Sequence, residues 1–537
     1  MEKNTKLTSK EQDIPQDQAK LKQTTLDAFL FQKKTTKLQE KQQSNDAMQI
    51  EEFKIDDPKQ ALGKAEEYKE TEENSNVSTN SSDFDVDQKI RSLQSAKSYK
   101  KIYILPHKSS KWPLIKSKLE SLATGLVKEN EFYSVLDDLI ALHLKGVNQK
   151  NNFSLLKTAI ASFSNFFDEV LPFMASVALK VDSLFPEDIP LLYQYEKRIL
   201  FLSKAQSACL LFHMFFCTTI NQNNQILPSP CTLAGWYNGV GPRDSSRTAK
   251  LRCFLNYARQ MKNNLPELEK ISIERTSLAS GVEYGINYWA GSTEPLSEVV
   301  MKEGSIQEAH GSLQIDFANK YLGGGVLNTG CVQEEIMFSV APEHLCSLLV
   351  TECLAPQEAA IIKGAQEYSK FTGYGDEFKY AGDFQGEIQP LDKFMRRDII
   401  TVAIDAMNFR TTDVKKQFQI ESILREMNKA LAGFQGSIQE RNEKTDVSRV
   451  VATGRWGCGA FRGDPQLKFI VQWLACSKAQ RKMVFYPFGD KSLSAAADLV
   501  QYYQKRSIGE LFQLVLSFVK DVKGEREEKL FEYLLSY

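Results

Sequence analysis

The sequence has few of the residues from which metal sites and disulfide frameworks are built. Among its 537 residues are only five histidines, and they form neither an HExxH pattern nor a His/Cys cluster. The nine cysteines include no CxxC pair, and several stand in apolar runs, namely Cys209, Cys217, Cys346 and Cys476. This usage predicts buried thiols in a reduced intracellular protein rather than disulfides. We therefore expect no metal centre and no cofactor.

Long apolar runs and an excess of one charge sign are also absent. No uncharged apolar run reaches the roughly 18 residues that a membrane-spanning helix requires. The polar N-terminus, MEKNTKLTSKEQDIPQDQ, lacks the apolar core of a signal peptide. Lysine and arginine total 67 against 68 acidic residues, for a net charge of −1. A protein that coats nucleic acid without specificity needs a broad basic surface, so this charge balance argues against that activity. Because no apolar run is long enough, we also expect no membrane span.

The first part of the chain, residues 1 to about 95, has little from which to form a core. It is rich in Lys, Gln, Glu, Asn, Ser and Thr, and it contains no Trp and no Cys. Such a segment buries too little apolar surface to offset its chain entropy, so we expect a disordered tail. The remaining length is sufficient for more than one domain.

One apolar island, QTTLDAFLF at 23–31, interrupts this tail. Leu26, Phe29 and Leu30 share one side of a short helical turn, behind a threonine that can cap it. The island resembles the peptide motif that docks on the DNA sliding clamp, with Gln23, Leu26 and Phe29 in the first three key positions. Leu30 occupies the position of the second aromatic residue. A chance cluster, or a turn that docks on its own protein, remains the alternative.

Residues 96–300 have a mainly helical pattern. Apolar residues recur at three-to-four spacing in SKLESLATGL, FSLLKTAIASFSNFF and EKRILFLSKAQSACLLFHMFFCT. We expect these segments to form a helical accessory domain, in which most of the apolar positions are simply core.

Strands are expected from about residue 301 onward. SLQIDFA (312–318) alternates apolar and polar residues, and DIITVAIDAM (398–407) is a continuous apolar run, as in a sheet core. RVVATG (449–454) leads through a glycine-rich loop into an amphipathic helix, and KMVFYPFGD (482–490) is a strand followed by a turn. Strands that alternate with helices predict an α/β domain over 301–505. The remaining 506–537 are expected to be helices packed on its core.

The segment GGGVLNTGCVQEEIMF (323–338) has a glycine triplet shortly before two glutamates. It fits neither common nucleotide-binding loop. The dinucleotide pattern GxGxxG fails because Asn328 stands at its last position. The P-loop spacing is present from Gly325 to Gly330, but Cys331 and Val332 replace the required lysine and hydroxyl. Open backbone followed by a helix start still favours an anion or a sugar hydroxyl.

Glu334 and Glu335 then stand in the first turn of the expected helix. Because neighbouring residues of a helix point about 100° apart, one carboxylate can face a substrate while the other anchors the loop. A general acid needs a raised pKa, and the charge of an adjacent carboxylate raises it. Two acids that merely stabilise a helix N-terminus are the alternative, and from this segment alone that interpretation is the commoner one.

Two further loops have features of a nucleotide-binding surface. GRWGCGAFRGD (454–464) places four glycines between a strand and a helix, which favours a pyrophosphate cradle of backbone N–H groups, with Phe461 able to cover a ligand. FTGYGDEF (371–378) sets Tyr374 between glycines, where an exposed ring can stack on a base, and Phe488 is a similar candidate. A tight turn and a partly buried tyrosine are the respective alternatives.

Together these stretches resemble the poly(ADP-ribose) glycohydrolases, whose signature is GGG, a short gap and QEE. The signature residues here are Gly323, Gly324, Gly325, Gln333, Glu334 and Glu335. DFANKYLGGG, TGYGDEF, VAIDA, WGCGAFRGD and FGD look like further blocks of that family, in the same order. LPHKSSKWPLIKSKLESL and LSKAQSACLLFHMFFCT resemble its helical accessory domain. The resemblance runs from about residue 103 to near the C-terminus and does not cover the tail.

The resemblance implies a macrodomain-like fold, in which three layers with a mixed sheet grip ADP-ribose beside a helical accessory domain. It implies an enzyme that hydrolyses the ribose–ribose O-glycosidic bonds of poly(ADP-ribose), mainly from the free end, and releases ADP-ribose. A macrodomain that binds ADP-ribose or its polymer without catalysis is the alternative. The QEE triplet, which such a binding module would not need, favours the enzyme.

The family's site residues can be carried over by position. Glu335 would be the acid that protonates the departing ribose oxygen, and Glu334 would hold a ribose hydroxyl. Asn319 would bind ribose beside the scissile bond, and Asp316 would support that loop. The other residues implied to bind the substrate are Gly323, Gly324, Gly325, Gln333, Tyr374, Gly457, Cys458, Gly459, Ala460, Phe461, Phe488, Ile306 and Gln307.

Within that set, residues 457–461 would take the diphosphate, while Tyr374 and Phe488 would flank the adenosine end. The family grips adenine through an Ile-Glu pair before the DFAN strand. This sequence reads Ile306-Gln307-Glu308 there, so the glutamate is displaced or replaced. Polymer turnover and the clamp-like island together favour the nucleus over the cytoplasm and a role in the DNA damage response.

Overall fold

The computed structural model describes residues 89–90, 102–143, 151–220, 231–239, 241, 243–442, 449–521 and 529–537. The tail with its island at 23–31 lies outside these residues. Within the described ranges, no helix combines the length and the apolar character needed to cross a membrane.

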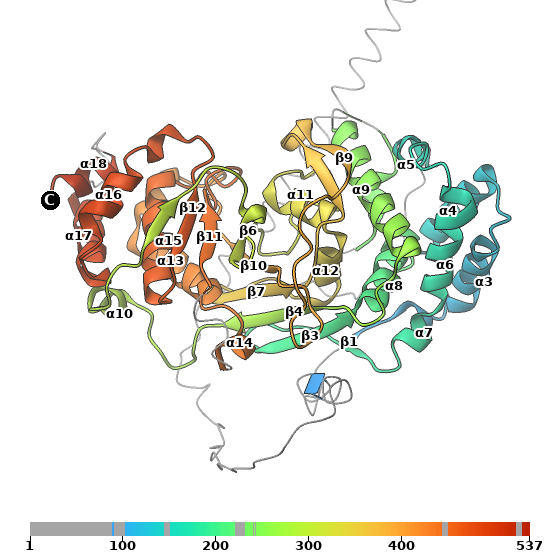
Figure 1. The fold of residues 1–537 in the computed structure, drawn as a ribbon, viewed down its shortest axis with the longest axis horizontal. Helices are drawn as coiled ribbons and strands as arrows, with labels where there is room; N and C mark the ends of the chain where they lie inside the picture. Colours follow the sequence, from blue (N-terminus) through green and yellow to red (C-terminus); the bar gives the residue numbers. More distant parts are fainter. Residues whose placement is uncertain are drawn as a thin grey trace, which may run out of the picture. The chain divides into compact units, whose positions relative to one another are not determined.

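An eight-stranded mixed sheet forms the centre of the described part (Figure 1). The pairings β3–β4, β4–β7 and β7–β10 are antiparallel. The pairings β10–β6, β6–β11, β11–β12 and β12–β5 are parallel. In order across the sheet, the strands are β3 (Arg198–Ser203), β4 (Lys270–Ser277), β7 (Glu358–Lys363), β10 (Ile400–Asp405), β6 (Leu313–Ala318), β11 (Val451–Gly454), β12 (Met483–Tyr486) and β5 (Val299–Met301). The four strands expected from the sequence are thus present as β6, β10, β11 and β12.

Helices cover both faces of this sheet, so the predicted α/β layering is confirmed. On one face lie α13 (Ile420–Phe434) and α15 (Pro465–Lys478), and on the other lie α11 (Gln333–Val340) and α12 (Cys346–Val350) (Figure 1). Strand β10 shows why: Val402 and Ile404 belong to the core with α13, whereas the Thr401 hydroxyl meets His344 on the α11 side. Alternate side chains of a strand point to opposite faces, and both faces here are apolar.

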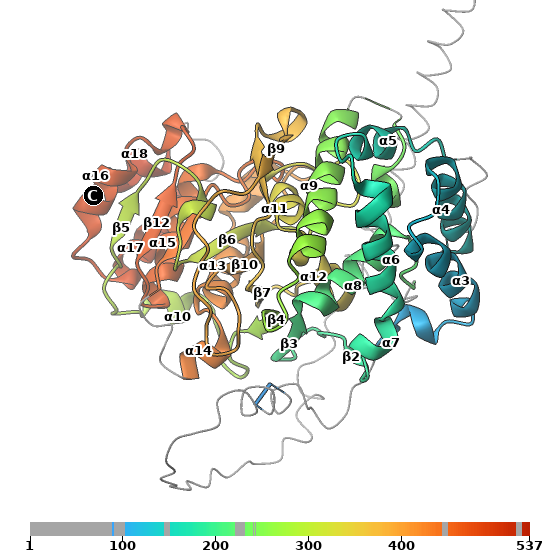
Figure 2. The same cartoon turned by 45° about the vertical axis from the view of Figure 1, so that its right-hand side comes forward.

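A second group of helices gathers on one side of the sheet (Figure 2). Their apolar faces share one core with β3, β4, α11 and α12, as Leu200, Ile271, Phe338 and Leu349 show. The helices of this group are α3 (Trp112–Ala123), α4 (Glu129–His143), α5 (Ser154–Ile160), α6 (Leu171–Leu179), α7 (Val181–Leu184), α8 (Lys204–Phe215) and α9 (Asp244–Asn263). The helical region is therefore not separated from the sheet by a gap in packing.

The structure corrects the expectation for EKRILFLSKAQSACLLFHMFFCT, which is not one helix. Its first part is β3, and α8 starts only after Ser203. There the Gln206 N–H donates to the Ser203 hydroxyl at 3.1 Å, and the Ser203 N–H donates to the Gln206 side chain at 2.9 Å. This reciprocal cap fixes the helix start, so the apolar residues before it are free to pair with β4.

Among the remaining elements, α17 (Ile508–Asp521) is long, and α18 (Leu530–Leu535) follows it near the C-terminus. Phe512 of α17 and Phe531 of α18 pack in the same core as α13 and α15. The bounds are α10 (Ile286–Ala290), α14 (Ile438–Asn442), α16 (Ala496–Tyr503), α17 (Ile508–Asp521), α18 (Leu530–Leu535), β1 (Ile102–Tyr103), β2 (Ile189–Pro190), β8 (Ser369–Thr372) and β9 (Lys379–Asp383).

Candidate functional site

A cavity of about 580 Å³ opens at the ends of the parallel strands. Asn319 follows β6, Arg455 follows β11 and Phe488 follows shortly after β12, and all three line it. The carboxyl ends of parallel strands are where open α/β sheets place their ligands. Its lining residues are Ser305, Ile306, Gln307, Phe317, Asn319, Gly324, Val332, Gln333, Glu334, Glu335, Ile336, Phe371, Tyr374, Arg455, Gly457, Gly459, Ala460, Phe461 and Phe488.

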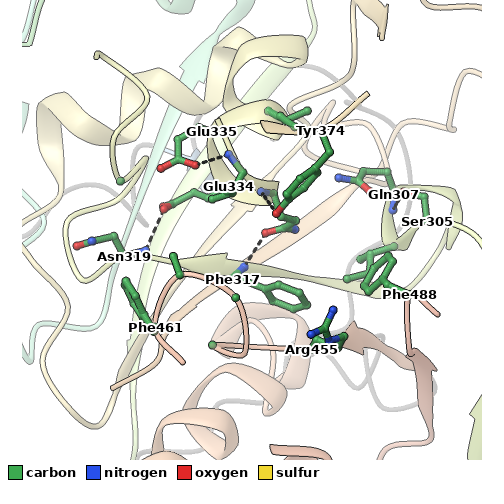
Figure 3. A pocket seen from close by; sticks show the side chains of 18 of the residues that line it. Ser305, Gln307, Phe317, Asn319, Glu334, Glu335, Tyr374, Arg455, Phe461 and Phe488 are labelled. Atoms are coloured by element: carbon green, nitrogen blue, oxygen red, sulfur yellow. Dashed lines mark hydrogen bonds between the residues drawn. The ribbon is translucent and has the colours of Figure 1, made fainter. Parts of the chain in front are cut away.

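At one end of the cavity, Glu334 ties the end of β6 to the glycine triplet. Its carboxylate accepts a hydrogen bond from the backbone N–H of Asn319 at 2.9 Å (Figure 3) and another from that of Gly323 at 2.6 Å. The side chain is almost fully buried. A buried carboxylate is kept in place by such charge-assisted bonds.

Glu335 is anchored in the same way. One of its oxygens accepts the N–H of Gly325 at 2.9 Å, and the other accepts the N–H of Val332 at 2.8 Å. A Cβ added at Gly324 would lie 2.7 Å from an oxygen of Glu334 and 2.7 Å from one of Glu335. Both acids therefore anchor the glycine triplet and both line the cavity, so the division of roles between them stays a prediction.

Asp316 lies below this pair as a third buried carboxyl group. Neither of its oxygens has a hydrogen-bond partner, and it does not line the cavity. Burial, with the charge of Glu335 second, raises its pKa well above the ordinary value. Asp316 therefore makes no hydrogen bond to the loop that follows β6, and its support of that loop stays a prediction.

The pKa of the Glu334 carboxyl is also raised well above its usual range. Burial is the main cause, followed by the charges of Asp316 and Glu335, while the two N–H groups that Glu334 accepts oppose the shift. Three carboxyl groups packed together out of water cannot all ionise cheaply, so this end of the cavity retains protons at pH values where exposed carboxyls have lost them.

Gln333 connects the helix start to the sheet rather than presenting a free amide. Its side-chain oxygen accepts the N–H of Phe317 at 2.9 Å, and its side-chain nitrogen donates to the carbonyl of Ile315 at 3.2 Å. Its backbone N–H donates to the hydroxyl of Tyr374 at 3.0 Å. Gln333 therefore lines the cavity and also holds Tyr374 in place. Tyr374 is 58% exposed at the rim of the cavity (Figure 3).

The glycine-rich loop after β11 forms the wall opposite the glutamates. Gly457, Gly459, Ala460 and Phe461 line the cavity, but Cys458 does not. The Cys458 thiol instead points to the Trp456 carbonyl oxygen at 3.6 Å, and burial raises its pKa. The backbone of Cys458 still belongs to the loop, so its part in binding the diphosphate stays a prediction.

A buried lysine side chain lies beneath this loop. Lys468 of α15 forms an ion pair with Glu426 of α13, and its nitrogen stands 4.1 Å from the ring centre of Trp456. A Cβ added at Gly457 would lie 3.3 Å from that nitrogen. The loop thus rests on the Lys468–Glu426 pair as well as on the strand below, and burial lowers the pKa of Lys468 well below its ordinary value.

The far end of the cavity is built from Ile306, Gln307 and Phe488 (Figure 3). Phe488 has a left-handed backbone with φ of 52° and is 46% exposed, so its ring is held out toward the cavity. The residues that the sequence placed here are therefore brought together by η5 (Ile306–Glu308) and the turn after β12. Among the other predicted residues, Gly323 and Gly325 stand behind the wall rather than in it.

Six lining residues were not predicted: Ser305, Phe317, Val332, Ile336, Phe371 and Arg455. Arg455 could have been found, because a cation within a glycine-rich anion loop is a direct signal. Phe317 packs against the same core as Leu313 and Ile315, and at the end of β6 it also lines the cavity. Within the described ranges, no group of three or more His, Cys, Asp or Glu side chains is arranged to hold a metal ion.

Comparison with known proteins gives two family matches. Residues 160–275 match the family described as poly(ADP-ribose) glycohydrolase, helical domain. Residues 286–495 match the family described as poly(ADP-ribose) glycohydrolase, macro domain fold. The predicted fold class, a macrodomain-like mixed sheet with a helical region, is thereby confirmed.

Similar full-length proteins include three from a plant and a nematode. Poly(ADP-ribose) glycohydrolase 1 of Arabidopsis thaliana is 29% identical over 438 residues, which cover 66% of this chain and 78% of that protein. Probable poly(ADP-ribose) glycohydrolase 2 of Arabidopsis thaliana is 26% identical, with 77% and 92% covered. Poly(ADP-ribose) glycohydrolase 2 of Caenorhabditis elegans is 31% identical, with 72% and 80% covered.

Proposed function

The chain belongs to the poly(ADP-ribose) glycohydrolase family, and we propose that it hydrolyses the ribose–ribose O-glycosidic bonds of poly(ADP-ribose) and releases ADP-ribose. One observation supports this most strongly. Glu334 and Glu335 converge on Gly324 at one end of a cavity whose other parts are a glycine-rich loop and exposed aromatic rings. Such an arrangement suits carboxyl chemistry on a sugar at one end and recognition of a nucleotide at the other.

Glu335 is the proposed general acid. Each of its oxygens uses one lone pair to accept a backbone N–H, which leaves the other lone pair for a proton. Protonated Glu335 donates to the oxygen of the departing ribose hydroxyl, the anomeric C–O bond breaks and its electron pair stays on that oxygen. Water adds to the resulting oxocarbenium-like carbon and returns its proton to the Glu335 carboxylate. Adjacent residues do not easily straddle a sugar as two separated glycosidase carboxylates do, which favours this single-acid route.

The remaining residues are proposed to bind one ADP-ribose unit. Glu334 and Asn319 hold the ribose whose bond is cut, and the loop at 457–461 takes the diphosphate on its backbone N–H groups. Tyr374 and Phe488 flank the adenosine. Support comes from their positions along one cavity: Glu334 and Glu335 are at one end, Phe488 is at the other, and Tyr374 lies between them with its hydroxyl accepting the Gln333 N–H (Figure 3).

Cleavage mainly from the free end of the polymer is the proposed mode. A terminal ADP-ribose unit is joined to the polymer only by the bond that is cut. An internal unit is also joined to a further unit through its adenosine ribose, so the polymer would have to leave the cavity at that end as well. The cavity volume of about 580 Å³ falls in the range of sites for one small ligand, which supports the terminal mode.

The test is release of ADP-ribose from purified poly(ADP-ribose) by the full chain and by its Glu335→Gln variant. We expect the variant to bind ADP-ribose nearly as well, because glutamine keeps the size of the side chain. Its turnover should fall by about 10²–10⁴-fold, since the proton donor is lost. Glu532→Gln, at an exposed position of α18, is the matched control and should behave like the unaltered chain.

The results separate the two candidate functions. Near-normal turnover by Glu335→Gln would show that the roles of the glutamates are wrongly assigned. If the unaltered chain binds ADP-ribose but releases none from the polymer, the non-catalytic binding module is the correct function.

For the N-terminal island we propose docking on the DNA sliding clamp through Gln23, Leu26 and Phe29, and with it a nuclear role in the DNA damage response. The support is the spacing of these residues in an otherwise polar segment. A peptide of residues 15–37 should bind the purified clamp, and the same peptide with Phe29→Ala should not. Absence of binding by the unaltered peptide would end this proposal, and exclusion of the tagged full chain from nuclei would overturn the assigned compartment.

A further inference from the structure

The loop between the glycine triplet and the paired glutamates is held from outside by α9. Lys250 is fully buried, and its ammonium donates hydrogen bonds to the carbonyl oxygens of Val326 at 3.0 Å and Asn328 at 3.2 Å, and to that of Gly330. A lysine ammonium has three N–H donors. The loop therefore occupies all of them, and the reaction as described above gives this side chain no part.

A second element of the helical region contacts the same loop. The indole N–H of Trp236, in η4 (Leu233–Trp236), donates to the Val326 carbonyl at 2.7 Å. At Gly235 an added Cβ would lie 2.3 Å from the Leu327 carbonyl oxygen, so only glycine permits this approach. The loop backbone is thus gripped along residues 326–330, and Lys250 supplies the charged part of that grip.

The position of this loop determines the surroundings of Glu335. The Gly330 N–H donates to the Gly325 carbonyl at 3.0 Å, which closes the loop on itself. The Gly325 N–H donates to Glu335, and a Cβ at Gly330 would lie 2.7 Å from that same Glu335 oxygen. Movement of the loop would therefore move both glycines that enclose the carboxylate.

The charge on Lys250 matters to this grip. Burial lowers its pKa to about 8; Cys331 and Glu335 oppose this shift, while Arg247 and Arg243 add to it. The neutral amine has no charge and only two N–H donors for three carbonyl oxygens. It would leave one buried carbonyl unpaired and would lose the stronger ion–dipole attraction to the other two.

We propose that protonated Lys250 is a positioning residue for glycosidic cleavage, which holds residues 326–330 so that Gly325 and Gly330 keep Glu335 in its reactive place. This inference rests on the proposed function. It assigns to the helical region a direct part in the reaction: α9 fixes the geometry of the catalytic loop, and the protonation of one lysine limits activity at alkaline pH.

The test compares Lys250→Met and Lys250→Arg with the unaltered full chain. Lys262→Met is the matched control, because Lys262 lies on the same helix but pairs with Glu169 at the surface. For each protein, kcat and KM on poly(ADP-ribose) and Kd for ADP-ribose are measured from pH 6 to 9, with circular dichroism to verify the fold at each pH.

We expect Lys250→Met to lose about 100-fold in kcat while Kd for ADP-ribose changes by less than about threefold, because only the loop at the reacting end is displaced. The unaltered chain should lose kcat on an alkaline limb near pH 8. In Lys250→Arg this limb should be absent, whatever activity remains, since arginine stays charged. Lys262→Met should match the unaltered chain throughout.

Three outcomes would overturn the inference: normal kcat in Lys250→Met, equal losses of kcat and ADP-ribose affinity, or an unchanged alkaline limb in Lys250→Arg. Failure of the proposed function is a separate result. In that case the unaltered chain releases no ADP-ribose at any pH, whereas failure of this inference alone leaves an active unaltered chain.

Discussion

Asp316 lies in an environment that is unfavourable to its own charge. Its carboxyl is fully buried with no hydrogen-bond partner, and Glu334 and Glu335 interact with it electrostatically. A carboxylate in such a place either finds a partner or takes up a proton. The raised pKa indicates that Asp316 takes up a proton. Retaining such a group at a functional site lowers the stability of the fold.

Replacement of Asp316 by asparagine should show this cost as a pH-dependent change in stability. Because the folded-state pKa of Asp316 lies above the unfolded value of about 3.9, its contribution to folding is fully present below that value. That contribution is lost as the pH rises through the folded pKa. Asparagine has no charge to lose, so the Tm of Asp316→Asn minus that of the unaltered chain should increase from pH 4 to pH 9.

Differential scanning calorimetry across this range measures the effect, and activity assays should show reduced turnover in the same variant. Asp498→Asn, at an exposed position of α16, is the control and should give a Tm difference independent of pH. A Tm difference for Asp316→Asn that stays constant or shrinks with pH would contradict the argument.

The sequence predicted which residue types meet in the cavity better than it predicted their contacts. Glu334, Glu335, Tyr374 and Phe488 all line it, as expected. The sequence did not predict that the Gln333 side-chain amide bonds to the backbone of β6, because the bonded partners stand 16 and 18 residues earlier in the chain. Contacts of this kind depend on how a loop folds back, which local pattern does not encode.

Strands β4 and β7 were missed for a reason that lies in their charged residues. Arg275 of β4 and Glu358 of β7 form a fully buried ion pair, with the Arg275 Nε donating to Glu358 at 3.0 Å. Read locally, KISIERTS and EAAIIK each carry charges that suggest a solvent-exposed segment. Strand β10 was predicted because its apolar run is not interrupted by charged residues before its last position.

The loop after β11 requires glycine at one particular point, and Gly457→Ala should test its part in binding. Gly457 has φ of +75°, and an added Cβ would lie 2.6 Å from the Cβ of Ala406. The variant should bind ADP-ribose at least about tenfold more weakly, since strain of about 1–2 kcal/mol from the left-handed backbone adds to a steric shift of the loop. Turnover at saturating polymer should change less, because Glu335 lies in the opposite wall.

Titration calorimetry with ADP-ribose measures this loss, and kcat completes the comparison. Gly311→Ala is the matched control, because Gly311 has φ of +73° but open space around its Cβ position. It shares the backbone strain without the collision and should bind ADP-ribose normally. Equal affinities for the Gly457 and Gly311 variants would show that the loop is not the diphosphate site.

The eight-stranded sheet joins the two regions that the family matches divide. Residues 160–275 supply β3 and most of β4, and residues 286–495 supply the other six strands. β4 pairs with β7 from Ser272 to Ser277, so the division falls inside a continuous hydrogen-bonded sheet. The mainly helical region expected over 96–300 therefore supplies two strands, β3 and β4, to the eight-stranded sheet.

A fragment of residues 286–537 should consequently fail to fold, although it contains every residue proposed to contact the substrate. Without β4, strand β7 becomes an unpaired edge, and Glu358 loses its buried partner Arg275. Apolar residues of α11 and α12, such as Phe338 and Leu349, lose the helices that cover them. We expect an aggregating protein without a cooperative thermal transition or ADP-ribose binding. A fragment that begins at Ser81 retains all eight strands and should unfold cooperatively with near-normal turnover, whereas a folded, active 286–537 fragment would show that the helical region is dispensable.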